Sequence, residues 1–502
     1  MGAPGLASVD MNGSWEQCLL LLKSPRVLLI AVAASVVLAP GLSLALHAGV
    51  PEGSIEGFID SEMPASGVPG LAYAVVADGE IDAVDGHGVS KIGGDREVTP
   101  DTPFLAGSIS KSFTALAVMQ LVEAEEVDLD TEVSQYLDGF SGQLAGAITI
   151  RQLLSHTSGF STLQGNASHT DATSGKDELA RRVDGLAEVN PAYEPDERWE
   201  YSNTNYEILG RLIEVVSGQE YQAYVAANIL EPVGMKHSFV ADGEIHESMA
   251  TGHRPWFGTK RPLPENPTHR GTAPQGGIVA SAGDLALYVQ MMMNGEDDVL
   301  SAEGKALMMR PASAASPFYG FGWYLDTRNG SVWHAGASPG FETLATMVPA
   351  EKKGVVVLVN GGSGIGFGET TQLRKGITAR AIDLDYDGEG SRWSQKALFI
   401  GLVLLPIVYV LSMIWAWRRR VEIRAKLKSG IFGLFSLWFP LLTTLVAAWV
   451  ILWLVPSLAG APLGTIRLFQ PDWGLALVAT AVSGVLWALF RLGVAYTGKS
   501  RV

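Results

Sequence analysis

The chain has 502 residues, 47% of them hydrophobic, and its mean hydropathy of +0.19 indicates membrane-spanning segments beside a large domain. Its formal net charge is −16, and the acidic residues dominate the middle of the chain, which argues against a nucleic-acid partner. The single cysteine, Cys18, precedes the first hydrophobic stretch, so we expect a domain without disulfides that depends on its core.

Residues 1–26 form a segment that we expect in the cytoplasm, because Lys23 and Arg26 precede the hydrophobic stretch 27–48. That stretch is either a signal peptide or an uncleaved membrane anchor. Small residues near its end offer cleavage sites, but the segment before it is long for a signal peptide, so both interpretations stay open.

One domain is expected over residues 49–390, ending in an acidic, glycine-containing linker. Its strands are predicted at the two ends, around an Asp78-Gly79 turn and before a β-branched run, over 70–89 and 330–361. Helical patterns lie between them, over 108–126, 201–218 and 281–295. We therefore predict an α+β fold, with an antiparallel sheet built from both ends of the domain, a helical subdomain inserted between them, and a cleft at the junction.

Three apolar segments follow, each without a charged residue and long enough to cross a hydrocarbon core of roughly 30 Å: 397–417, 431–455 and 473–490. Basic residues follow the first and third of them, so the positive-inside rule predicts that the loop 418–428 and the C-terminus are cytoplasmic. The sequence thus predicts a multi-pass protein of the cell membrane, with the lipid bilayer as a partner and the 49–390 domain on the extracytoplasmic face.

Ser108 and Lys111 stand three residues apart at the start of the helix 108–126, so they share one face of that helix. A lysine becomes a useful base when apolar surroundings lower its pKa, and a serine beside such a base can act as a nucleophile. The alternative is a helix-capping serine and a lysine that extends into solvent. This is the only Ser-x-x-Lys in the chain, and Gly107 before it would let a substrate approach the backbone.

Two further patterns carry candidate chemistry. In Tyr201-Ser202-Asn203 the phenol can relay a proton and the amide can hold a substrate carbonyl, although packing and capping are the alternative roles. His334-Ala335-Gly336 lies on a predicted strand, whose backbone N–H groups could stabilise an oxyanion while Gly336 keeps the approach open.

In this order and spacing the three patterns resemble those of the serine β-lactamases and penicillin-binding proteins, specifically the class C β-lactamase-like serine hydrolases. Four phrases add to the resemblance: RQLLSHTSGF (151–160), GGIVASAGDLALYV (276–289), YGFGW (319–323) and HAGASPGF (334–341). The resemblance implies the β-lactamase/transpeptidase-like fold and roles for seven residues. It makes Ser108 the acylated nucleophile, Lys111 and Tyr201 its proton-handling partners, Asn203, His334 and Gly336 substrate-binding residues, and the N–H groups of Ser108 and Ala337 the oxyanion hole.

His334 stands where many members of that group have lysine. A largely neutral imidazole pairs less well with a substrate carboxylate, which weakens penicillin and D-Ala-D-Ala as natural substrates and leaves room for ester, aminopeptidase or amidase chemistry. An exported domain followed by three helices is similar to the membrane-bound peptidases that remove an N-acyl-D-amino-acid cap from nonribosomal peptides.

We therefore expect a membrane-anchored, extracytoplasmic serine hydrolase, first of all a peptidase or amidase acting on a small molecule or peptide. The alternatives are a D,D-carboxypeptidase or β-lactamase, an esterase, and a non-catalytic penicillin-binding-type sensor. No cofactor or metal is expected: His246-Glu247 begins like a zinc-protease helix, but His253 follows after seven residues and not four. His156 is expected to make a structural hydrogen bond, and a homo-oligomer stays open.

Overall fold

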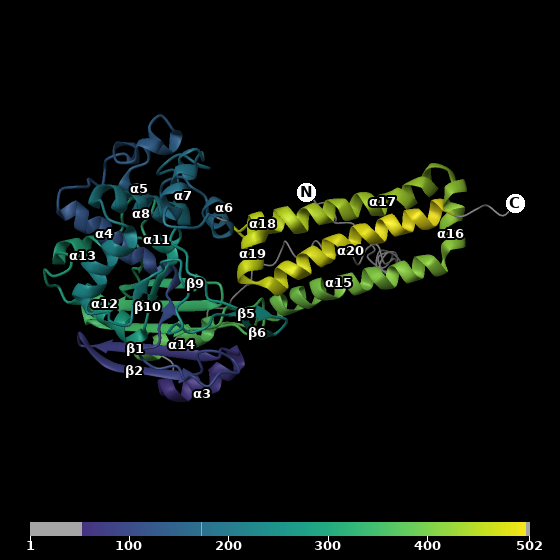
Figure 1. The fold of residues 1–502 in the computed structure, drawn as a ribbon. Coiled ribbons are helices and arrows are strands. Elements are labelled where there is room, and N and C mark those ends of the chain that lie inside the picture. The colour runs from purple at the N-terminus through teal and green to yellow at the C-terminus, as the bar shows by residue number, and fades with distance from the viewer. Residues whose placement is uncertain (1–52, 172, 498–502) are drawn as a thin grey trace, which may run out of the picture. The chain divides into compact units, whose positions relative to one another are not determined.

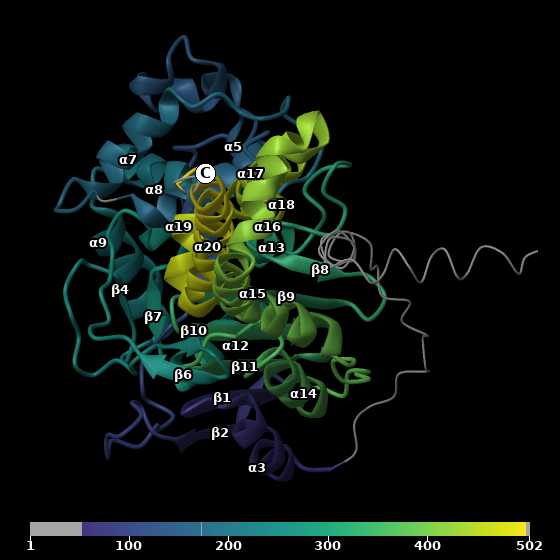
Figure 2. The same ribbon diagram turned by 90° about the vertical axis from the view of Figure 1, so that its right-hand side faces the viewer.

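The computed structural model describes residues 53–171 and 173–497, so the predicted segments 1–26 and 27–48 lie outside the described residues. The described residues belong to one structural unit. Its main sheet has six antiparallel strands in the order β2-β1-β11-β10-β9-β8, all labelled in Figure 2, with the sheet seen from another side in Figure 1. Their bounds are β1 Gly70–Ala77, β2 Glu80–Gly88, β8 Tyr324–Asp326, β9 Ser331–Ser338, β10 Phe341–Val348 and β11 Lys353–Val359.

The centre of this sheet joins the two ends of the domain, as predicted. Strand β1 pairs with β11, with Leu71 opposite Val359, so the first hairpin and the last strand lie side by side. The turn between β1 and β2 is formed by Asp78 and Gly79, whose φ angles of 51° and 84° give the left-handed conformation that a tight two-residue hairpin requires. Both predictions for this part of the chain are confirmed.

Both faces of the sheet are covered, because alternate residues of the central strands point to opposite sides. On one face, Tyr73 and Val357 pack against helices α3 (Ile55–Ser66) and α14 (Thr371–Ala381). On the other face, residues such as Ala74 and Leu358 belong to the larger core shared with α4 (Ser110–Glu123) and α12 (Ala282–Met293) (Figures 1 and 2). The β-branched run of β11 is therefore buried on both sides, which explains why it reads as continuously apolar.

A helical subdomain is inserted between β2 and β8. Its longer helices are α4 Ser110–Glu123, α7 Glu178–Ala187, α8 Asn203–Ser217 and α12 Ala282–Met293. Its shorter helices are α5 Ile150–Leu154, α6 Thr162–Ala167, α9 Tyr221–Val225, α10 Glu231–Val233, α11 Ala273–Gly276 and α13 Ala302–Met308. Two small sheets accompany them, β3 Phe104–Leu105, β7 Ile278–Ala280 and β4 Phe239–Val240 in one, and β5 His253–Trp256 and β6 Thr259–Pro262 in the other.

Three helical spans follow this domain, each long and apolar enough to cross a membrane: Trp393–Arg418, Gly430–Leu458 and Pro471–Tyr496. They contain α15 Trp393–Arg418, α17 Gly430–Trp449, a π-helical turn Val450–Leu454, α18 Val455–Leu458 and α20 Pro471–Tyr496. The short helices α16 Arg420–Ala425 and α19 Leu463–Phe469 connect them. The three predicted apolar segments are thus helices of sufficient length and hydropathy to cross a membrane, and α20 packs along both α15 and α17 (Figure 1).

Candidate active site

Ser108 lies in the single turn η1 (Gly107–Ile109), which leads directly into α4, so it precedes Lys111 by one helical turn. Gly107 has a φ of 58°, in the left-handed region that favours glycine. A Cβ on Gly107 would lie 2.7 Å from the amide nitrogen of Ala337, so a side chain here would push β9 away from Ser108. Glycine at this position therefore permits the close approach of β9 to the serine.

The side chain of Lys111 is fully buried, and its Nζ atom has three polar neighbours. Nζ lies 3.2 Å from Ser108 Oγ, 2.8 Å from Asn203 Oδ1 and 2.7 Å from the backbone oxygen of Gln275. Burial lowers the pKa of Lys111 well below its usual range, and the negative charge of Glu207 opposes that shift only in part. Lys111 therefore loses its proton far more readily than an exposed lysine.

These contacts determine where the lone pair of the neutral amine points. A neutral amine has two N–H groups and one lone pair. The oxygens of Asn203 and Gln275 accept the two N–H groups, which leaves the lone pair facing Ser108 Oγ. In this state the amine can accept the hydroxyl proton, so the geometry is that of a general base beside a potential nucleophile.

Tyr201 completes the group around Ser108. Its hydroxyl hydrogen-bonds with Ser108, and its ring centroid lies 4.9 Å from Lys111 Nζ. Burial and the neighbouring Tyr324 raise the pKa of Tyr201 well above its usual value, which the hydrogen bond with Ser108 only partly offsets. Tyr201 is therefore a protonated phenol at neutral pH, able to donate a proton and regain it.

His156 supports the segment that carries Tyr201. Its Nδ1 atom accepts a hydrogen bond from the backbone N–H of Ser202 at 3.2 Å, and its ring packs 4.4 Å from the ring of Tyr201. Burial lowers the pKa of His156 well below its usual value, so the ring is neutral and can accept that bond. The prediction of a structural hydrogen bond for His156 is confirmed.

Asn203 is the first residue of α8 and is buried, with one side of its amide toward Lys111. Its Nδ2 atom lies 3.0 Å from Asn166 Oδ1 and 3.2 Å from His169 Nε2. Neither Asn166 nor His169 was predicted as a site residue. No catalytic motif marks them, since only the tertiary fold brings the end of α6 and the short turn Ser168–Thr170 that follows it against the start of α8.

Strand β9 supplies the edge that faces Ser108. Its neighbour β8 pairs only with the first part of β9, from Ser331 to Trp333, so the later residues have no strand on that side among the described residues. Gly336 lies tightly against the segment before Ser108, because a Cβ there would meet Ala106 O at 2.0 Å. Ala337 is exposed, and its amide nitrogen lies close to Gly107, the residue before Ser108, so its predicted place in an oxyanion hole stays a prediction.

His334 is buried beneath this edge. Its Nδ1 lies 2.8 Å from the backbone oxygen of Ala335, which can only accept, so Nδ1 carries the proton. Its Nε2 is then the acceptor for the Tyr319 hydroxyl at 3.3 Å. Burial and the nearby Lys111 lower the pKa of His334 to about 3, against the opposing effect of Ala335, so the ring is neutral. Its contact with substrate stays a prediction.

The other histidines weighed from the sequence have ordinary partners. His246 Nε2 pairs with Asp242 at 3.0 Å, while the buried His253 bonds through Nε2 to the N–H of Ile92 and through Nδ1 to the oxygen of Asn360. Among the residues that the structure describes, one group could offer three ligand atoms to a metal ion: Glu56, Asp85 and His87, on α3 and β2.

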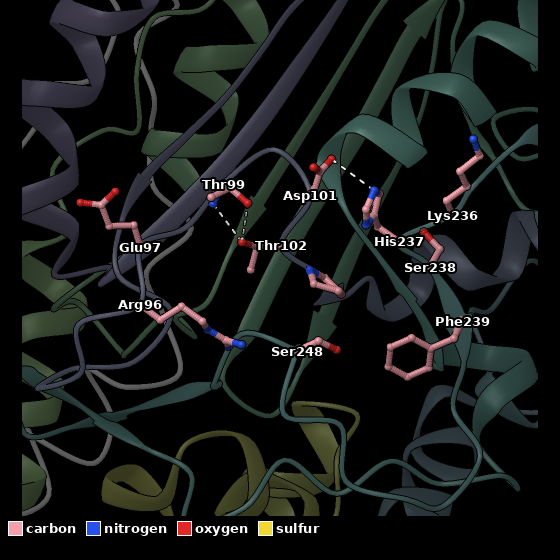
Figure 3. Close-up of a pocket in the computed structure, with 11 residues that line it drawn as sticks. Arg96, Glu97, Thr99, Asp101, Thr102, Lys236, His237, Ser238, Phe239 and Ser248 are labelled. Atoms are coloured by element: carbon pink, nitrogen blue, oxygen red, sulfur yellow. Dashed lines mark hydrogen bonds and ion pairs between the residues drawn. The ribbon is translucent and has the colours of Figure 1, made fainter.

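Two of the cavities in the described part of the chain bear on the site. One of about 430 Å³ is lined by polar side chains, among them Arg96, Asp101 and His237, and Figure 3 shows Asp101 paired with His237. It contains none of the predicted site residues. A second cavity of about 610 Å³ is lined by His169, Arg254 and residues of α19 and α20, so it lies beside the Asn203 amide.

The sheet, the inserted helices and the Ser108, Lys111, Tyr201 and Asn203 cluster define a serine hydrolase of the β-lactamase and penicillin-binding-protein class. Residues 55–379 match the family model described as Beta-lactamase, and the chain belongs to that family. The predicted family and fold are confirmed.

One relative in sequence and two solved structures illustrate the similarity in more detail. The chain is 34% identical to Penicillin-binding protein 4 of Amycolatopsis lactamdurans over 323 residues, which cover 60% of this chain and 83% of that protein. It is similar to the structure of the octameric penicillin-binding protein homologue from Pyrococcus abyssi, with a TM-score of 0.56, 27% identity, and coverage of 66% of this chain and 77% of that one. A solved class C beta-lactamase shares the fold, with a TM-score of 0.54, 21% identity, and coverage of 65% and 94%.

Proposed function

We propose that this serine hydrolase cleaves an amide or ester bond through an acyl-enzyme on Ser108, that it acts outside the cytoplasm, and that it is a peptidase or amidase. The observation that carries the proposal is the buried Lys111, whose Nζ lies 3.2 Å from Ser108 Oγ, 2.8 Å from Asn203 Oδ1 and 2.7 Å from Gln275 O, so that the neutral amine would turn its lone pair to Ser108. A lysine in that environment can take a proton from the serine without the help of a metal ion or an organic cofactor.

In the first step, Ser108 Oγ bonds to the substrate carbonyl carbon while its proton moves to Lys111 Nζ. The N–H groups of Ser108 and Ala337 stabilise the oxyanion that forms. Tyr201 gives its proton to the leaving nitrogen or oxygen as the scissile bond breaks, and it regains a proton from Lys111. Water then attacks the carbonyl carbon of the acyl ester and gives a proton to Lys111 or Tyr201. The bond between that carbon and Ser108 Oγ breaks, Oγ regains a proton from the same two groups, and the acid leaves.

The state of His334 bears on the substrate. A fixed cation at that strand position would pair with a substrate carboxylate, whereas His334 has a pKa of about 3 and is neutral at the pH of most environments. This favours an amide or ester whose leaving group has no carboxylate at that point. D,D-carboxypeptidase, β-lactamase and esterase activity, and a sensor role, are the alternatives that the assay below separates.

The orientation in the membrane is part of the proposal. Basic residues follow α15, over 418–428, and by the positive-inside rule they favour the cytoplasmic side. Gly460, near the other end of the second span, contacts Asn166 of the catalytic domain. The catalytic domain and the basic loop therefore attach to opposite ends of the spans.

The orientation is tested in a Cys18→Ser chain that carries one new cysteine at a time. Asp95→Cys should react with a membrane-impermeant maleimide in intact cells and Ser429→Cys should not; the reverse pattern contradicts this orientation.

The catalytic proposal is tested on the full chain in detergent with a fluorophosphonate probe. Wild type should be labelled on one peptide containing Ser108, and Ser108→Ala should lose the label; labelling that persists in Ser108→Ala refutes the assignment. A panel of N-acyl-D-amino-acid amides, D-aminoacyl amides, short esters and a chromogenic β-lactam then identifies the activity. Many turnovers on an amide support a peptidase or amidase, whereas stoichiometric acylation without turnover favours the sensor.

A further inference from the structure

One side chain, Asn166, connects the membrane region with the catalytic cluster. Its Nδ2 donates to the backbone oxygen of Gly460 at 2.8 Å, and its own backbone oxygen accepts from the Thr465 hydroxyl at 2.7 Å. Its Oδ1 accepts from Nδ2 of Asn203 at 3.0 Å. Gly460 follows α18 and Thr465 belongs to α19, so both partners lie in the segment that joins the second and third membrane spans.

These contacts orient two amides in turn. A backbone carbonyl can only accept, so Gly460 O requires the NH₂ group of Asn166 and leaves Asn166 Oδ1 toward Asn203. That oxygen in turn requires the NH₂ group of Asn203, which leaves Asn203 Oδ1 toward Lys111. The acceptor that Lys111 needs is therefore specified, through Asn166, by a carbonyl of the membrane region.

His169 adds a second contact of the same kind. Its Nε2 lies 3.2 Å from Asn203 Nδ2, and its ring meets Phe469 of α19 edge-on at 5.1 Å. Burial lowers the pKa of His169 to about 4, so a ring nitrogen is free to accept from an NH₂ group. His169 thus supports the same orientation of Asn203 and rests on the same short helix.

The orientation of Asn203 decides the direction of the Lys111 lone pair. If the Asn203 amide turned over, its NH₂ group would face Lys111 Nζ at 2.8 Å, and the amine would accept from it. The lone pair would then point at Asn203, and Ser108 Oγ would lose its base. The alternative orientation is penalised by the unpaired groups that it creates at Asn166, Gly460 and His169.

We infer that Asn166 is a positioning residue of the acylation step, and that Gly460 and Thr465 of the membrane region are structural parts of the active site. The inference rests on the proposed acyl-enzyme mechanism. The four hydrogen bonds from Gly460 through Asn166 and Asn203 to Lys111 and Ser108 are called the amide relay below. It makes the membrane region a determinant of catalytic rate as well as an anchor.

The test uses the full chain in detergent or liposomes and measures the rate of fluorophosphonate acylation across pH. Thr465→Val removes the donor to Asn166 and should lower the plateau rate about tenfold, whereas Thr465→Ser keeps the hydroxyl and should restore it. Asn166→Leu removes both amide contacts and should lower the rate by about a hundredfold, with kcat reduced and KM for an amide substrate little changed. Thr443→Val is the control, because that hydroxyl donates only within its own helix.

The outcomes separate the inference from the proposed function. If wild type is not labelled on Ser108, the proposed function fails, and the inference fails with it. If wild type is labelled but Asn166→Leu and Thr465→Val react at the wild-type rate, the inference alone is overturned. It is also overturned if Thr465→Ser is as slow as Thr465→Val, or if Thr443→Val is slowed equally, since either result indicates a general effect on the membrane region. Thermal melting of each variant shows that rates are compared between folded molecules.

Discussion

Gly336→Ala is the sharpest test of the geometry between β9 and the serine. The added methyl group would lie 2.0 Å from the backbone oxygen of Ala106 and 2.2 Å from Thr343 Oγ1. Ordinary van der Waals contact begins near 3.4 Å, so strand and carbonyl must separate by about 1.4 Å. Neither neighbour yields easily, because Ala106 O is a backbone atom that also accepts the Thr343 hydroxyl at 2.7 Å.

A displacement of this size takes the N–H of Ala337 out of hydrogen-bonding range of an oxyanion formed at Ser108. The loss of one oxyanion-hole donor costs about 2.7–4 kcal/mol, which corresponds to a 10²–10³-fold lower rate of acylation. Stopped-flow acylation by a chromogenic ester, normalised to the fraction of folded protein by active-site titration, measures this rate.

Gly185→Ala serves as the matched control, because a Cβ at Gly185 in α7 has no atom within 4 Å, so its acylation rate should equal that of wild type. A Gly336→Ala protein that acylates within threefold of wild type would refute the assigned oxyanion hole. If Gly185→Ala acylates as slowly as Gly336→Ala, the lower rate is a general effect of replacing a glycine and is no evidence for the oxyanion hole.

Three further predictions concern the site and its scaffold. Acylation should fall as pH drops through the lowered pKa of Lys111, because the protonated amine has no lone pair; an acylation rate that does not change with pH would contradict the role of Lys111 as the base. Tyr201→Phe should slow amide hydrolysis at least a hundredfold but p-nitrophenyl ester hydrolysis much less, since that leaving group departs without a proton; equal losses would remove Tyr201 from the proton transfer. Arg374→Ala leaves Glu342, whose side chain is 14% exposed, without its ion-pair partner at 2.7 Å and should destabilise the domain by about 3–5 kcal/mol in thermal melting, while Arg328→Ala, with an 87% exposed side chain, should melt like wild type.

The fold was predictable because its signals are local. A few neighbouring residues determine the conformation at three places: the Asp78-Gly79 turn, the β-branched run of β11 and the glycine that ends α8. Ser108, Lys111, Tyr201 and Asn203 were predictable for a different reason, since the order and spacing of three short motifs match a known family.

The contacts that set the protonation, orientation and burial of these side chains were not predictable from the sequence. The two acceptors on Lys111 are a side chain 92 residues away and a backbone oxygen 164 residues away, and a backbone acceptor leaves no trace in residue identity. The same holds for Asn166, whose partner Gly460 is 294 residues distant and contributes only a carbonyl. The burial of His334 also depends on packing across the sheet. The pattern His-x-Gly does not single it out, because His47-Ala48-Gly49 and His269-Arg270-Gly271 match it too.

The amide relay has a consequence for where the reaction can take place. A protease that cut the linker at 383–391 would separate Ser108, Lys111 and Tyr201 from Gly460 and Thr465. If the segment 27–48 had been removed as a signal peptide, the fragment would leave the bilayer and yet hydrolyse slowly, because Asn166 would lose its contacts with both residues. Cleavage of the linker would therefore lower the hydrolytic rate at the same time as it separated the domain from the three membrane spans.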